Sequence, residues 1–209
     1  QRERVENLQG KTDLKELAAR LQEAHLLVSG DTGTLHLAAA LGTRTVGVFL
    51  GPALCFETGP YGEGHYVFQA EPRCHPCAEA WAECPESICQ AMIPADAVAD
   101  LVVSLCTDGE IFGPPSLPAG TRLYRSFFDP MGVSYAPVAA GTRFIDLVGQ
   151  AYRRAGGELV GLTCPSVLPR ILPLGEGNRQ DLERLVMALS NGQAAAAASP
   201  VLAQALTPL

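Results

Sequence analysis

One stretch of the chain decides the fold: residues 26–49, which read LLVSGDTGTLHLAAALGTRTVGVF. A short apolar run ends at Ser29, a Gly-containing turn follows, and a helix is predicted from Leu35 to Leu41. A second apolar run, residues 45–49, comes next and is again followed by glycine and proline. A strand, a helix and another strand in this order predict parallel strands joined by a crossover helix.

The neighbouring segments continue this alternation. Upstream, apolar residues recur at helical spacing from Leu14 to Leu21, with Thr12 as the expected N-cap. Downstream, we expect a short strand over residues 65–68 and a helix over residues 94–105. The first half of the chain is therefore predicted to be an α/β fold with a Rossmann-like parallel sheet.

Composition narrows the class of protein. The 209 residues are 47% hydrophobic and 18% charged, as in soluble globular chains. The net charge of −7 has the wrong sign for a nucleic-acid partner, whose phosphates need cations. No apolar run approaches the roughly 18 residues of a transmembrane segment. Because the first residues, QRERVENLQG, contain neither Met nor an apolar signal region, we expect a cytoplasmic chain that lacks its beginning.

The charge also predicts a division of the chain. Residues 1–106 carry the whole net charge, whereas residues 107–209 are neutral. Residues 107–120 are rich in proline and glycine and are expected to be a linker. Residues 121–209 are then a mixed, mainly helical extension of unknown role, with helices over 144–155 and 179–189 and a strand over 159–162.

The turn after the first strand is the best candidate for a ligand site. A Gly-rich turn that leads into a helix presents backbone N–H groups and the positive end of the helix dipole to an anion such as phosphate. Thr32 and Gly33 are candidate donors to a diphosphate, Asp31 a candidate acceptor from a ribose or sugar hydroxyl, and His36 faces the same crevice. The alternative is that Asp31 caps the helix and His36 packs against the sheet.

A second loop follows the second strand. It contains Gly51, Pro52 and Gly59. In open α/β sheets, ligands bind beyond the carboxyl ends of the strands, so this loop is a candidate to close over a nucleotide. The alternative is a rigid surface connection.

The order of these motifs resembles glycosyltransferase family 9, the heptosyltransferases of the lipopolysaccharide core, over about residues 5–106. The resemblance rests on Asn7–Thr12, on residues 27–33 with His36, on residues 46–49, on Gly51-Pro52 and on Gly59-Pro60-Tyr61-Gly62.

The resemblance implies a two-lobed GT-B glycosyltransferase, of which this chain is part of the C-terminal, donor-binding lobe. It implies inverting, metal-independent transfer of a sugar, with ADP-heptose as donor, to a lipid-linked saccharide acceptor at the inner face of the membrane. The enzyme would then be peripheral to that membrane. The residues that match the family's donor diphosphate site are Asp31, Thr32, Gly33 and His36.

The catalytic base of such enzymes belongs to the N-terminal lobe, so it is expected upstream of Gln1 and no residue here is assigned to it. We therefore expect this chain to be inactive alone, with the missing N-terminal lobe as a partner. Two other functions remain open. One is a non-catalytic nucleotide-binding or scaffold module, and the other is a different sugar-nucleotide enzyme of GT-B fold, such as an epimerase.

Four cysteines lie within residues 71–90, with the spacing C-x2-C-x6-C-x4-C: Cys74, Cys77, Cys84 and Cys89. Tetrahedral zinc is typically held by two such pairs of thiolates, although the second spacing is unusual. A structural zinc site, a set of reduced or redox-labile thiols, and an iron–sulfur cluster are the alternatives.

Overall fold

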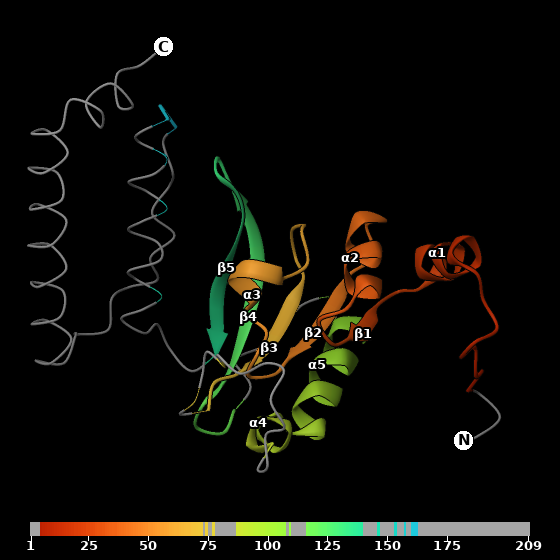
Figure 1. Ribbon diagram of the computed structural model, residues 1–209, viewed down its shortest axis with the longest axis horizontal. Coiled ribbons are helices and arrows are strands. Elements are labelled where there is room, and N and C mark those ends of the chain that lie inside the picture. The colour runs from red at the N-terminus through yellow and green to blue at the C-terminus, as the bar shows by residue number, and fades with distance from the viewer. Residues whose placement is uncertain are drawn as a thin grey trace, which may run out of the picture. The chain divides into compact units, whose positions relative to one another are not determined.

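A five-stranded sheet in the order β1-β2-β3-β4-β5 is the framework of residues 1–140 (Figure 1). In this computed structural model the described residues are 5–72, 74, 77, 87–107, 109, 116–139, 146, 153, 157 and 160–162. The strands β1 (Leu27–Ser29), β2 (Thr45–Phe49) and β3 (Tyr66–Ala70) are parallel. They confirm the predicted Rossmann-like α/β fold. Antiparallel strands β4 (Thr121–Asp129) and β5 (Gly132–Ala139) complete the sheet.

Five helices are defined within the described residues: α1 (Leu14–Glu23), α2 (Gly33–Ala40), α3 (Cys55–Thr58), α4 (Ile88–Met92) and α5 (Ala95–Thr107). The N-cap of α1 is Asp13 rather than Thr12. Its carboxylate accepts from the Glu16 amide at 2.8 Å, and the Glu16 carboxylate accepts from the Asp13 amide at 2.9 Å. Only Asp13 has an acidic partner three residues later, so it alone is able to form this capping box.

The core consists of two apolar clusters. One contains Val46, Tyr66, Phe68 and Leu123 and is joined by Leu101 and Leu105 of α5. The other contains Phe49, Val67, Tyr124 and Tyr135 and is joined by Leu35 of α2 and Cys55 of α3. Successive residues of a strand point to opposite faces, so Val67 and its neighbours in β3 enter different clusters. Every residue of β3 is buried, as expected of a strand covered on both faces.

The strands β4 and β5 correct the predicted domain boundary. The first unit runs to residue 140, not to 106, because Thr121 to Arg125 pair with β3. The expected linker ends within this unit, where the Glu71 amide donates to the carbonyl of Gly120 at 2.7 Å. The extension of unknown role therefore begins at Gly141.

The second unit, residues 141–209, contains few described residues. The helices expected over 144–155 and 179–189 lie almost wholly outside them and stay predictions. The strand expected over 159–162 is wrong, since residues 160–162 form a turn in which the amides of Val160 and Leu162 donate to the carbonyl of Gly157. Within the described part of the chain, no helix combines the length and hydrophobicity needed to cross a membrane.

Candidate functional site

The predicted donor motif lies where β1 ends and α2 begins. Thr32 is the N-cap residue, but its side chain does not cap the helix, since its Oγ1 lies 3.0 Å from Ser29 Oγ. The first amide groups of an α-helix have no acceptor within the helix, and they carry the positive end of its dipole. Gly33, the first residue of α2, is exposed. The start of α2 therefore presents N–H groups to an anion.

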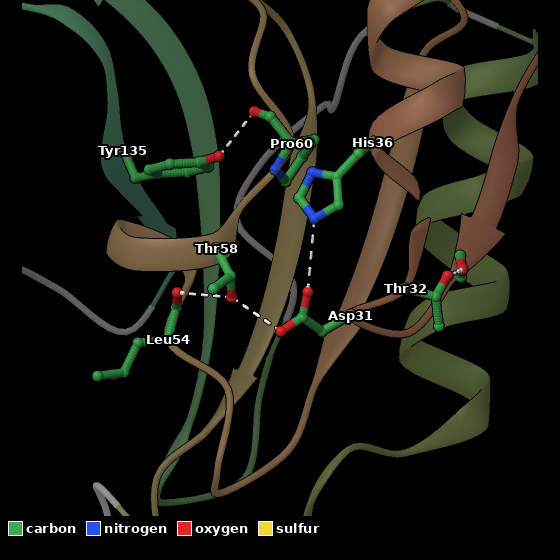
Figure 2. A network of polar contacts seen from close by, with 8 residues as sticks. Asp31, Thr32, His36, Leu54, Thr58, Pro60 and Tyr135 are labelled. Atoms are coloured by element: carbon green, nitrogen blue, oxygen red, sulfur yellow. Dashed lines mark hydrogen bonds and ion pairs between the residues drawn. The ribbon is translucent and has the colours of Figure 1, made fainter. Parts of the chain in front are cut away.

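Asp31 does not cap α2, since the N-cap is Thr32. The alternative role expected for Asp31, that of a helix cap, is therefore excluded. Its Oδ2 accepts a hydrogen bond of 2.8 Å from Thr58 Oγ1, and its Oδ1 lies 3.7 Å from His36 Nε2 (Figure 2). Each carboxylate oxygen has two lone pairs, so both keep capacity for a further donor such as a sugar hydroxyl. The structure thus brings two predicted site residues together: the carboxylate of Asp31 faces the imidazole of His36.

His36 does not pack against the sheet, which removes the other structural explanation. Its side chain is 45% exposed, and that of Asp31 is 29% exposed. The residue before it, Leu35, is fully buried and anchors the helix in the core. An exposed ion pair contributes little to stability, about 0–1 kcal/mol, so folding alone does not require this pair.

The three candidate residues in the loop after β2 do not lie together. Gly59 directly follows Thr58 and therefore adjoins the Asp31 site. Gly51 does not: its carbonyl accepts from the Cys77 amide at 3.1 Å, and a Cβ at Gly51 would contact Cys77 and Cys89. Pro52 is exposed beside it. That Gly51, Pro52 and Gly59 contact a nucleotide stays a prediction.

Three residues that the sequence patterns did not single out hold this loop. Thr58 binds Asp31 directly. Gln69, 1% exposed in β3, accepts from the Cys55 amide at 3.1 Å and donates to the Ala53 carbonyl at 2.7 Å. Tyr135 of β5 donates to the Pro60 carbonyl at 2.7 Å (Figure 2). Of the three, only Gln69 could have been noticed in the sequence, because a polar residue that continues an apolar strand needs hydrogen-bond partners when it is buried.

Burial raises the pKa of the Tyr135 hydroxyl far above its ordinary value of 10, and the nearby Cys55 thiol raises it further. The hydroxyl therefore stays protonated and remains a donor. A Cβ at Gly59 would overlap this hydroxyl and the Cys55 carbonyl, so only glycine allows the loop to approach β5 so closely.

The cysteine cluster is described in part. Cys74 is exposed, Cys77 and Cys89 are partly buried, and Cys84 lies outside the described residues. Among the side chains that are described, no three His, Cys, Asp or Glu are grouped to hold a metal ion. Cys77 and Cys89 nevertheless both lie within 4 Å of the place that a Cβ at Gly51 would take, although they are twelve positions apart in sequence. The zinc site stays a prediction.

Comparison with known proteins agrees with the motif order. Neither the curated proteins nor the solved structures contain a match to this chain. The model of glycosyltransferase family 9 (heptosyltransferase) matches residues 1–87, a segment that includes β1, α2 and the Asp31–Thr58 contact. This match confirms the predicted resemblance and supports a glycosyltransferase. Residues 1–87 are therefore similar to glycosyltransferase family 9.

Proposed function

We propose that the start of α2 binds the diphosphate of a nucleotide sugar in a heptosyltransferase that uses ADP-heptose as donor. The observation that carries the proposal is the exposed Asp31–His36 pair at the first turn of α2, inside the segment that the family model matches. Backbone N–H groups of the turn and the helix dipole favour a bound anion. The same groups favour the negative charge that grows on the leaving diphosphate during transfer.

The two side chains have complementary roles in this proposal. His36 donates a hydrogen bond to the diphosphate and stabilises the negative charge that grows there as it leaves. Asp31, whose Oδ1 lies 3.7 Å from His36 Nε2, offers acceptor lone pairs to a hydroxyl of the donor. In the related enzymes transfer is inverting and independent of metal ions, and we extend both properties to this chain. We also propose a lipopolysaccharide-type acceptor, linked to lipid and reached at the membrane surface.

Calorimetric titration of the full chain with ADP, UDP and GDP tests donor binding. We expect ADP to bind most tightly and binding to persist in EDTA. Asp31→Asn and His36→Gln should each weaken it by about tenfold, the loss of one charge-assisted contact. The matched controls are Asp100→Asn and His25→Gln, which change exposed residues outside the site. Binding that is unaffected by the site variants would exclude this site.

Transfer is tested separately, by incubating ADP-heptose with a lipopolysaccharide-core acceptor and measuring the release of ADP. Release of ADP that requires the acceptor would demonstrate transfer of the sugar. Conversion of the nucleotide sugar without an acceptor would instead indicate an epimerase. Failure to bind any nucleoside diphosphate would favour a scaffold module.

A further inference from the structure

Thr58, at the end of α3, holds the Asp31 carboxylate. Its Oγ1 lies 2.8 Å from Asp31 Oδ2 and 3.4 Å from the carbonyl oxygen of Leu54 (Figure 2). A hydroxyl has one proton to donate, and hydrogen bonds to ionised carboxylates are shorter and stronger than those to carbonyls. The Thr58 hydroxyl therefore donates to Asp31.

The position of Thr58 is set from outside its own helix. The helix α3 has only four residues, and so short a helix has little stability of its own. Gln69 fixes its start through the Cys55 amide and the Ala53 carbonyl. Beyond its end, Gly59 packs against Tyr135, whose hydroxyl binds the Pro60 carbonyl. Two strands, β3 and β5, therefore present Thr58 to Asp31.

Without this contact the carboxylate would be poorly defined. Asp31 lies in an exposed turn, and the other contact described for its side chain is the 3.7 Å approach to His36. Exposed pairs of this kind are weak, so they do not hold a side chain in one rotamer. The hydrogen bond from Thr58 is shorter and comes from a loop anchored in the core.

We propose that Thr58 is a positioning residue of the donor site, which holds Asp31 in the orientation that pairs with His36 and accepts from the donor. The inference rests on the proposed function. It also gives a role in the site to the β4–β5 hairpin, residues 121–139, which lies outside the matched segment. Through Tyr135 this hairpin supports the loop that carries Thr58.

The test is calorimetric titration of full-length variants with ADP. Thr58→Val removes the hydroxyl at nearly constant volume and should weaken binding by about three- to tenfold. Thr58→Ser restores the hydroxyl and should bind within about twofold of the wild type. Thr107→Val is the matched control, since Thr107 likewise ends a helix, α5, and its hydroxyl donates to the Val103 carbonyl at 3.0 Å. A circular dichroism spectrum checks that each variant is folded.

A double-mutant cycle separates positioning from a general structural effect. If Thr58 acts through Asp31, then adding Thr58→Val to Asp31→Asn should change ADP affinity by less than about twofold. Additive losses, or a Thr58→Val variant that binds as the wild type does, would overturn the inference while the proposed function stands. If wild-type protein binds no nucleoside diphosphate, the proposed function fails and this inference fails with it.

Discussion

Replacing Gln69 with Met tests whether the loop after β2 is held by one buried amide. Methionine has nearly the same shape but makes neither hydrogen bond. The Cys55 amide is then left buried without its 3.1 Å acceptor, at a cost of about 1–3 kcal/mol. The Ala53 carbonyl loses its 2.7 Å donor but is only partly buried, so water is able to replace part of that bond. The free energy of unfolding should fall by about 2–3 kcal/mol.

Urea unfolding followed by circular dichroism measures this loss, and hydrogen exchange of peptides that cover residues 50–62 locates it. For a protein of this size the same loss lowers the melting temperature by about 5–10 °C. Gln22→Met is the matched control, since Gln22 is exposed on α1. Equal stability of the two variants, or unchanged exchange at α3, would refute the account of how this loop is held.

Three further predictions concern single groups. Tyr135→Phe should lower the free energy of unfolding by about 1–3 kcal/mol in urea titrations, because the buried Pro60 carbonyl loses its donor; an unchanged value would contradict this. Burial and the neighbouring Arg44 lower the pKa of His65 below 6.5 in the folded protein. The free energy of unfolding should therefore be highest above about pH 6.5 and should fall as the pH decreases, with a slope of up to about 1.4 kcal/mol per pH unit. His65→Asn should flatten this slope. Elemental analysis should find close to one zinc per chain, lost in a Cys74→Ser, Cys77→Ser variant; iron with sulfide, or no metal, would favour the other two cysteine chemistries.

Local patterns predicted what local interactions determine. The strands and helix of residues 26–49 follow from hydrophobic periodicity and turn residues, and the structure has them at 27–29, 33–40 and 45–49. Asp31 and His36 meet because one precedes the helix and the other lies one turn into it, a spacing visible in the sequence. The exact cap of α1 required the reciprocal partner of Asp13 as well as a capping residue type.

Long-range contacts set the rest of the site. Thr58 reaches Asp31 across 27 residues, and Tyr135 reaches Pro60 across 75, distances over which no periodicity carries information. The hairpin that brings Tyr135 was missed, although Asp129-Pro130-Met131-Gly132 is a turn signal between two runs of strand-forming residues. Leu123 and Tyr124 are also both buried, each in a different apolar cluster, so this part of β4 lacks the alternation of buried and exposed residues that marks a strand with one face in solvent.

Calorimetric titration of the full chain with ADP, UDP and GDP in EDTA, beside His36→Gln and its control His25→Gln, tests for a donor site at the start of α2. We predict binding of at least one nucleoside diphosphate, tightest for ADP, that His36→Gln weakens by about tenfold and His25→Gln leaves unchanged. Absence of binding to all three, or binding that survives His36→Gln intact, would contradict a donor site at the start of α2.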